Sequence, residues 1–355
     1  MNIITKYLGR TIVIHIAMVI LFLLGLQMFI EFMQEFRHIG IGNYGLLQML
    51  TCVLLLLPYD IYQFFPMAGL LGCVLGMGLL ASHSELIAMR ASGLSLLDIA
   101  KAITKAAICL IIVMLLIGEG IAPMAQKNAM RKKAMAMSGG QALVTTKGIW
   151  VRSENSFLHI NAIAGDKELQ GITRYEFGEN KKIKTISYAQ KGLHKGGAWV
   201  FSSIVQTIFT DSSRITSVSM PEQVWPLTLS RKLIETVNIH PDQESIVKLY
   251  SYIKHRKQVG LSTLDYEFIF WQRVFTPISA LIMILLAIPF VFGPLRSATM
   301  GLRMLSGIIL GFAFHISSQF VGPMSGVYQI PPVLAAMLPM LIFAAIGGVL
   351  LIRAK

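Results

Sequence analysis

The sequence predicts an α-helical integral membrane protein, with six transmembrane helices and an inserted periplasmic all-β domain of the jelly-roll type. Hydrophobic residues make up 54% of the 355 residues and charged residues only 14%, whereas soluble domains carry about 25% charged residues. Six stretches reach the roughly 20 mainly apolar residues that a membrane-crossing helix needs. Well over half of the charged residues lie in one segment between the third and the fourth stretch. This distribution predicts a polar domain between two apolar blocks.

The candidate spans cover residues 11–32, 60–81, 102–122, 274–292, 304–321 and 333–352. Residues 46–57 are also apolar, but Pro58 and Pro66 interrupt the run that follows them. A proline inside a helix removes a backbone hydrogen bond and kinks the chain. We therefore interpret residues 46–57 as a kinked extension of the second span, and a short seventh span is the alternative.

Lysine and arginine in the short loops predict the orientation, because these residues collect on the cytoplasmic side of a membrane. Basic residues stand at one set of helix ends: Lys6, Arg10, Arg90, Lys101, Lys105, Arg296, Arg303, Arg353 and Lys355. The opposite ends carry Glu31, Glu35, Asp60 and Glu119, with Arg37 as the exception. Both termini are therefore expected in the cytoplasm and the large insert in the periplasm.

The insert has the pattern of β structure. Short runs rich in β-branched and aromatic residues recur at 148–152, 157–160, 172–177, 183–188 and 199–201, and several of them alternate apolar with polar residues. Many short antiparallel strands at this spacing favour a jelly roll or a sandwich. From residue 241 the pattern becomes helical, because Ile246, Leu249, Tyr250 and Ile253 recur at helical spacing. This amphipathic helix is expected to lead back to the membrane.

Several classes of function are disfavoured by what the sequence lacks. The net charge of +13 comes without zinc-ligand spacing or an RNA-binding signature, so no nucleic-acid partner is expected. An anionic lipid surface or substrate explains the same charge. No phosphate-binding loop, metalloprotease motif or nucleophile elbow is present, so no catalytic residue and no metal ligand is predicted. We expect a non-catalytic membrane subunit.

The stretch between the second and the third span carries the most informative motif. Ser84 is placed to cap a short helix, Glu85 lies in its electropositive first turn, and Gly93 is placed to end it. An apolar ridge would run along this helix, formed by Leu86, Ala88 and Met89. Such a helix can dock into a groove on a soluble partner, or it can be a solvated connection between two spans. The pattern alone leaves both interpretations open.

Two motifs in this part of the chain, FFPMAGLLG at 64–72 and SELIAMRASG at 84–93, resemble the LptF/LptG permease family. That family forms the membrane part of the lipopolysaccharide exporter, an ABC transporter. FGPLRSATMGLR at 292–303 and FVGPMSGVYQIPP at 320–332 are more similar to its LptG than to its LptF members. The resemblance covers the whole chain in order. In the insert it rests on the strand pattern, on GIW at 148–150 and on GDKEL at 165–169.

The resemblance implies a division of the chain and a set of partners. Residues 1–126 would hold three spans with a cytoplasmic coupling helix at 83–93, residues 127–265 the periplasmic jelly roll, and residues 266–355 the other three spans. LptF would pair with this chain around a cavity that takes lipopolysaccharide from the inner membrane of a Gram-negative bacterium. LptC would join near the first span, and the jelly rolls would lead toward LptA. An LptB dimer would bind ATP and Mg, which leaves no cofactor for this chain.

The resemblance also implies that the coupling helix is seated in LptB. The residues at that contact would be Ser84, Glu85, Leu86, Met89 and Arg90, with Glu85 pairing a basic residue of LptB. The alternative function is a non-transporting mechanotransmission or scaffold subunit of an ABC complex, which would need the coupling helix but no lipid cavity. A proton-driven transporter is disfavoured, because the sequence shows neither repeated halves nor acidic residues near the middle of a span.

Extraction of a phosphorylated lipid would need cations at the periplasmic rim of the membrane. The candidate head-group contacts are Arg37, His38, Arg131, Lys132 and Lys133. The first two lie just outside the first span, where interfacial anchoring is the alternative. The last three follow the third span against the positive-inside trend, with a solvated helix face as the alternative. Glu31 and Met130 stand where relatives carry basic residues, which leaves the exact contacts open.

Overall fold

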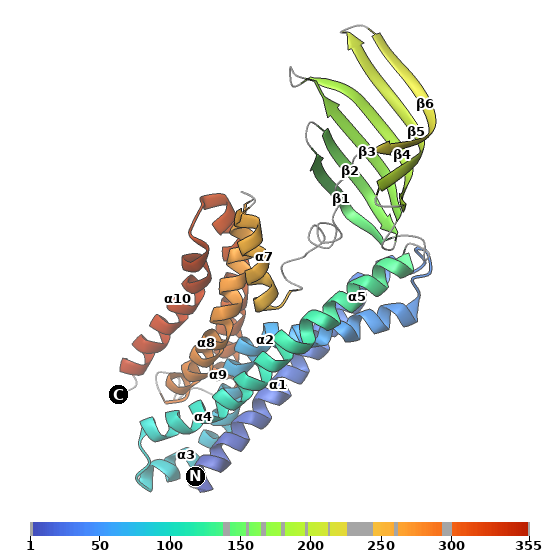
Figure 1. Ribbon diagram of the computed structural model, residues 1–355. Helices are drawn as coiled ribbons and strands as arrows, with labels where there is room; N and C mark the ends of the chain where they lie inside the picture. Colours follow the sequence, from blue (N-terminus) through green and yellow to red (C-terminus); the bar gives the residue numbers. More distant parts are fainter. Residues whose placement is uncertain are drawn as a thin grey trace. The chain divides into compact units, whose positions relative to one another are not determined.

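The computed structural model describes residues 3–137, 143–153, 156–164, 168–178, 182–195, 198–211, 214–225, 244–258, 262–292 and 300–353 (Figure 1). The chain forms two compact units. The first consists of Met1–Gln34, Val53–Lys127 and Pro241–Lys355, and it is helical. The second consists of Glu35–Cys52 and Asn128–His240, and it contains the described strands.

Long helices, most of them apolar, build the first unit. They are α1 (Ile3–Glu35), α2 (Leu46–Ser82), α4 (Leu96–Leu115), α5 (Ala122–Met137), α8 (Leu264–Phe292), α9 (Met300–Tyr328) and α10 (Pro332–Arg353). Three of them, α1, α2 and α5, also contain residues of the second unit. A π-helical turn, η2 (Leu116–Ile121), joins α4 to α5. Within the described residues, six helical segments are long and apolar enough to cross a membrane. They contain the six predicted spans, and residues 46–57 extend the second span, as predicted.

The membrane helices differ in how much of their apolar surface the chain itself covers. Of the most apolar stretch in each helix, 78% is buried in α2, but only 22% in α1 and 17% in α9. Phe65, Leu70 and Met77 of α2 belong to the main core of the helical unit. α1 and α9 instead expose large apolar side chains, including Phe22 and Phe320. Surfaces of this kind suit a bilayer or an apolar partner.

One close contact fixes α1 against α2. Gly72 packs on the backbone of Ile16, and a Cβ atom at this position would overlap the Cα and N atoms of Ile16. Small residues let two membrane helices approach to backbone distance. Leu8, Ile12 and Ile16 join the main core, so the contact brings a full row of α1 side chains into that core.

The third span contains the irregular turn η2. Such π-turns occur frequently at functional positions. Gly118 in this turn packs on the ring of Tyr62 in α2, where a Cβ atom would overlap the ring. The hydroxyl of Tyr62 donates a 3.3 Å hydrogen bond to the backbone oxygen of Arg273 in α8. The wide turn therefore lies where α2, the third span and α8 meet.

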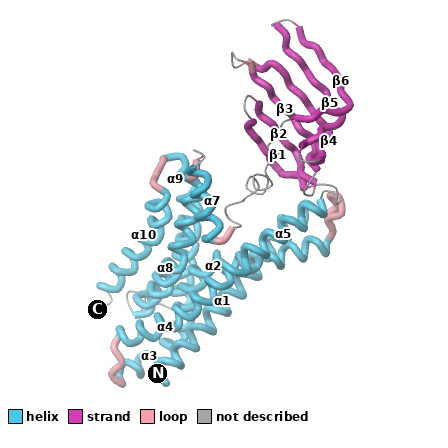
Figure 2. Tube along the Cα trace, viewed as in Figure 1, coloured by secondary structure: helices cyan, strands magenta, loops and turns pink. Residues whose placement is uncertain are grey.

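The second unit holds one antiparallel sheet (Figure 2). Its strands are β1 (Leu143–Ser153), β2 (Ser156–Ala164), β3 (Glu168–Phe177), β4 (Ile183–Lys195), β5 (Ala198–Asp211) and β6 (Arg214–Trp225). They lie in sequence order, so each strand pairs with its neighbours along the chain. The predicted β structure is confirmed. A jelly roll packs two sheets together, whereas the described strands form a single meander, so the jelly roll stays a prediction.

The five predicted strand runs lie within β1 to β5, but no strand is predicted from the sequence where β6 forms. Pro221 interrupts the alternation there, and it is tolerated because β6 is an edge strand of the sheet. In the buried cluster of the sheet, Phe201 of β5 stacks on Trp225 of β6 with ring centroids 4.3 Å apart. Both rings are buried, and they fix β6 to its neighbour.

The amphipathic helix after the insert is α7 (Ile246–Gln258). It buries Leu249, Tyr252 and Ile253, so two of the four predicted apolar positions face the core. The prediction is wrong for Tyr250, which is 59% exposed. Tyr252 is buried instead, and its ring centroid lies 4.9 Å from that of Tyr266 in α8, with the two rings tilted.

Candidate functional site

The predicted coupling helix is present as α3 (Glu85–Ala91). It ends as predicted, because Gly93 adopts a φ of 92°. The amide of Gly93 donates to the Arg90 carbonyl at 3.1 Å, and the amide of Leu94 donates to the Met89 carbonyl at 3.2 Å. These two bonds form the Schellman arrangement, in which a glycine adopts the left-handed conformation.

The capping prediction for Ser84 is wrong. Its backbone is left-handed, with a φ of 61°, and its side chain makes no capping hydrogen bond to a described residue. A capping residue has an extended backbone that aims its oxygen at the first free amides of the helix. Ser84 instead forms the tight turn that follows α2, and its carbonyl oxygen accepts the first α-helical bond from the Ala88 amide at 3.0 Å.

Two of the three residues of the apolar ridge predicted on α3, Leu86 and Met89, face the core of this chain, whereas Ala88 is exposed. Leu86 is only 2% exposed, and Met89 packs against the same core cluster. A helix of two turns has one face to bury, and this face is already covered. Ile87, at 60% exposure, is the large apolar side chain that α3 leaves outside. The surface open to a partner therefore consists of Ile87, Ala88 and the polar residues around them.

Both charged side chains of α3 have contacts within the chain. The hydroxyl of Tyr7 in α1 donates a 2.9 Å hydrogen bond to Glu85 Oε2, and His83 Nδ1 lies 4.0 Å from Glu85 Oε1. The guanidinium carbon of Arg90 lies 6.0 Å from the ring centroid of Phe292, the last residue of α8. α3 is therefore connected to the first and the fourth span, while Glu85 stays partly exposed.

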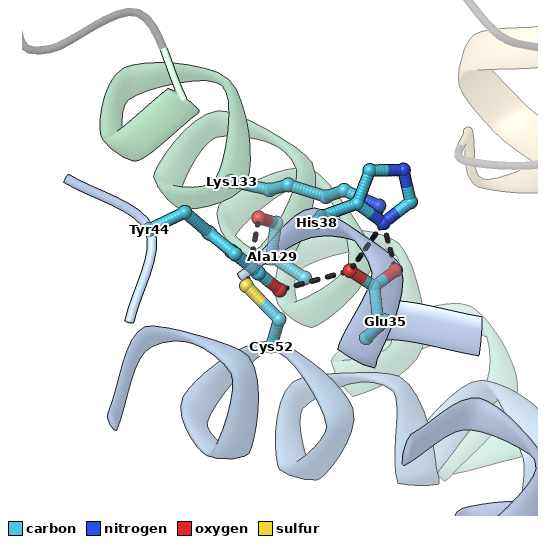
Figure 3. Close-up of polar contacts among 6 residues, drawn as sticks. All are labelled: Glu35, His38, Tyr44, Cys52, Ala129 and Lys133. Atoms are coloured by element: carbon cyan, nitrogen blue, oxygen red, sulfur yellow. Dashed lines mark hydrogen bonds and ion pairs between the residues drawn. The ribbon is translucent and has the colours of Figure 1, made fainter. Parts of the chain in front are cut away.

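Two of the predicted head-group contacts, Lys133 and His38, converge on one carboxylate in the second unit (Figure 3). Lys133 Nζ lies 2.6 Å from Glu35 Oε1. The hydroxyl of Tyr44 donates a 2.9 Å hydrogen bond to Glu35 Oε2, and His38 Nδ1 lies 3.6 Å from the same oxygen. In the sequence, Glu35 is recognisable only as an acidic residue at a helix end. The structure makes it the centre of this cluster.

Local packing holds Glu35 and Tyr44 in place. Tyr44 is buried, and its phenol pKa is raised first by burial and then by the hydrogen bond to Glu35. It therefore keeps its proton and donates throughout the physiological pH range. The amide of Asn43 donates a 2.7 Å bond to the carbonyl of Ala136 in α5. This bond ties the turn that carries Tyr44 to the helix that carries Lys133.

The other candidate contacts are more open. Arg37, Arg131 and Lys132 are exposed, and Lys132 lines a cavity of about 290 Å³ between α2 and α5. Met130, on the same helix, is 47% exposed. The structure thus brings His38 and Lys133 together and leaves the three other cations at the surface. Across the described ranges, no group of three His, Cys, Asp or Glu side chains could hold a metal ion.

An ionic cluster that the sequence does not predict surrounds Glu119 of η2, in the first unit. Arg273 Nη1 of α8 lies 3.3 Å from Glu119 Oε1, and the backbone amide of Ile246 donates a 2.8 Å bond to Oε2. Glu244, just before α7, pairs with Lys127 Nζ at 2.5 Å. Arg273 and Glu244 are buried. These contacts tie the third span, α7 and α8 together.

A cavity of about 520 Å³ lies among α2, α8, α9 and α10. Tyr62, Gln272 and Phe268 contribute to its mixed polar and aromatic lining. His315 of α9 also lines the cavity. Its Nε2 atom lies 2.9 Å from Gln319 Nε2, and its ring stacks on Phe64. His315 and Gln319 are therefore engaged with each other, as expected for polar side chains inside a helical bundle.

Comparison with known proteins covers all of these elements. The family model for the lipopolysaccharide export system permease LptF/LptG matches residues 6–353. The chain is 37% identical over 356 residues to the lipopolysaccharide export system permease protein LptG of Escherichia coli strain K12, across 99% of this chain and 98% of the relative. It is 32% identical to LptG of Haemophilus influenzae, across 100% and 99%. With both helical blocks and the β insert included in the match, the chain belongs to the LptF/LptG permease family.

Proposed function

We propose that this chain is the permease subunit of an ATP-driven lipopolysaccharide exporter. With an LptF partner it forms the cavity that extracts lipopolysaccharide from the inner membrane and passes it to a periplasmic bridge. The observation that carries this proposal is the relationship to proteins named LptG over the whole chain. A relationship limited to the apolar helices would support only a membrane location, whereas this one includes the insert.

The exposed faces of α1 and α9 are the surfaces that we assign to the lipid cavity and to LptF. Only 22% and 17% of their most apolar stretches are buried within this chain. Acyl chains and a partner helix are both apolar, so either can pack against such a face. One chain of six spans would then supply half of the enclosure, and LptF the other half.

In this proposal the energy comes from a separate LptB dimer, which binds ATP and Mg and docks on α3. Glu85, Ile87 and Arg90 offer the accessible contact surface. Leu86 and Met89 pack on the core of the helical unit, so a displacement of α3 would be passed to the spans on which they pack. Closure of the LptB dimer would thus narrow the lipid cavity. The chain itself would hydrolyse nothing.

The same proposal fixes the orientation. α3 and both termini would lie in the cytoplasm, and the insert, over residues 127–265, would lie in the periplasm. The described sheet would belong to a jelly roll that leads toward LptA, and LptC would join beside α1. Residues 1–126 and 266–355 would each carry three spans.

The head-group phosphates would be bound by the candidate cations of the second unit. Arg37, Arg131 and Lys132 are exposed, so each can reach an anionic group without first losing an ion pair with another described residue. His38 and Lys133 already face Glu35, so their contact with a phosphate depends on that residue.

Replacing Glu85 with lysine tests the coupling role. In a complex purified with LptB and LptF homologues, Glu85→Lys is expected to lower lipopolysaccharide-stimulated ATP hydrolysis by about tenfold or more, because a hydrogen bond to a charged group contributes about 1.5–3 kcal/mol. Tyr7→Phe is the matched control, since it removes the hydroxyl that donates to Glu85 and leaves the charge in place; it should retain most of the stimulation.

Undiminished stimulation and normal assembly of the Glu85→Lys complex would contradict the coupling role. A wild-type complex whose ATP hydrolysis does not respond to lipopolysaccharide would contradict the proposed function itself.

A further inference from the structure

The carboxylate of Glu35 stands where an anionic ligand of Lys133 would stand. Its Oε1 atom lies 2.6 Å from Lys133 Nζ, and a phosphate oxygen bound to the same ammonium would lie at about 2.7–2.9 Å. The Lys133 ammonium has three N–H donors, but like charges repel, so the Glu35 carboxylate at this distance opposes the approach of a phosphate to the same cation. A phosphate therefore pairs fully with Lys133 only when Glu35 moves away.

We propose that Glu35 is an internal counter-ion, which a lipid phosphate must displace from Lys133 and His38, and that this exchange makes the site selective for phosphorylated lipids. The inference rests on the proposed function and deepens it, because it names the residue that controls access to the head-group cations.

The geometry around Glu35 allows the exchange. The side chains of Lys133 and Glu35 are 22% and 16% exposed, so the pair is covered but can be reached. The two carboxylate oxygens have separate partners, since Oε1 faces Lys133 and Oε2 accepts from Tyr44. When a phosphate takes Lys133, the carboxylate keeps its hydrogen bond from the Tyr44 hydroxyl and is not left without a donor.

His38 adds an unused polar atom to the cluster. Its Nδ1 atom is buried and makes no hydrogen bond within the described part of the chain, because Glu35 Oε2, at 3.6 Å, is too distant for one. A buried nitrogen without a hydrogen bond is costly. A phosphate oxygen that entered beside Lys133 would offer this nitrogen a partner.

Charge decides which ligand can enter. A phosphate monoester carries about −1.5 to −2 charges at neutral pH, whereas the Glu35 carboxylate carries one. A lipid that presents only hydroxyl groups has no charge with which to replace Glu35, so it would leave the Glu35–Lys133 pair intact.

Binding of two lipids to the complex with LptB and LptF homologues tests the exchange. The probes are a bisphosphorylated lipid A and the same lipid after removal of its phosphates. The amide of Glu35→Gln can still accept from Tyr44 but carries no charge. We expect this variant to bind the phosphorylated lipid about tenfold more tightly, which corresponds to about 1.4 kcal/mol, and to bind the dephosphorylated lipid as the wild type does.

Two further variants separate this effect from a general change in charge or stability. Glu176→Gln makes the same chemical change at a carboxylate that pairs with Arg174 at 3.4 Å in the sheet, and it should leave both affinities unchanged. In a Lys133→Gln background, Glu35→Gln should give no gain, because the cation that it releases is missing. The ratio of the two affinities within one preparation does not depend on the fraction of folded protein.

The outcomes separate the two proposals. Three results would overturn the counter-ion role while the wild-type complex still binds the phosphorylated lipid: Glu35→Gln brings no gain in affinity, it brings an equal gain for both lipids, or its gain persists without Lys133. In each of these cases the proposed function stands. If inorganic phosphate at equal concentration displaces the lipid, the site recognises a free anion, which also overturns the inference. If the wild type binds neither lipid, both proposals fall.

Discussion

Replacing Gly72 with leucine is expected to prevent α1 from packing on α2. A Cβ atom at this position would already overlap the backbone of Ile16, and a backbone cannot move aside as a flexible side chain can. Overpacking a core costs typically about 1–3 kcal/mol, and more where the backbone must shift. We expect a loss of at least about 3 kcal/mol, seen as a lower melting temperature of the detergent-solubilised protein and a reduced monodisperse fraction.

Gly348→Leu is the matched control for this prediction. It makes the same change in a membrane helix, α10, but a Cβ atom there would meet no described atom within 4 Å. It should melt close to the wild type. Equal melting temperatures for Gly72→Leu and Gly348→Leu would show that the contact between α1 and α2 is not tight.

Replacing Glu119 with leucine is expected to destabilise the helical unit by about 3 kcal/mol. Removing one partner of a buried ion pair costs about 3–5 kcal/mol, and the lower end applies because the Glu119 side chain is 23% exposed. The substitution also removes the acceptor of the Ile246 amide at the start of α7. Thermal unfolding of the purified protein measures the loss, which should be larger than that of Glu176→Gln, whose more exposed pair contributes about 0–1 kcal/mol.

A double variant makes the ionic origin of this effect testable. Glu119→Leu with Arg273→Met replaces both charges by apolar side chains, and such replacements of a whole buried pair are often neutral. The double variant should therefore recover most of the stability that Glu119→Leu loses. If it is less stable than Glu119→Leu alone, the ion pair is not the source of the loss.

The membrane helices and the β character of the insert could be predicted because their signals are local. A run of about 20 apolar residues or an alternation of Val, Ile and Thr with polar residues is complete within a few turns or one strand. The pairs that organise the two clusters are not local. Glu119 and Arg273 are 154 residues apart, and Glu35 and Lys133 are 98 apart. In the sequence each of these carboxylates is only an acidic residue near a helix end.

The orientation of α3 shows a second limit. Leu86 and Met89 have the spacing of a helix that docks on a partner, but the same spacing suits a helix that packs on its own chain. Only the tertiary structure decides between the two, and it buries Leu86 in the main core. The capping prediction for Ser84 is wrong for a different reason. Serine favours capping positions, but the turn after α2 requires a left-handed backbone at this residue.

The winding of the third span depends on η2. A π-turn spans five residues where an α-turn spans four, so side chains beyond it are rotated by about 100° relative to an uninterrupted helix of 3.6 residues per turn. Lys127 reaches Glu244 with this rotation in place. Deleting Gly120, where a Cβ atom would meet no described atom within 4 Å, would remove no side chain but would swing Lys127 around the axis and away from its partner.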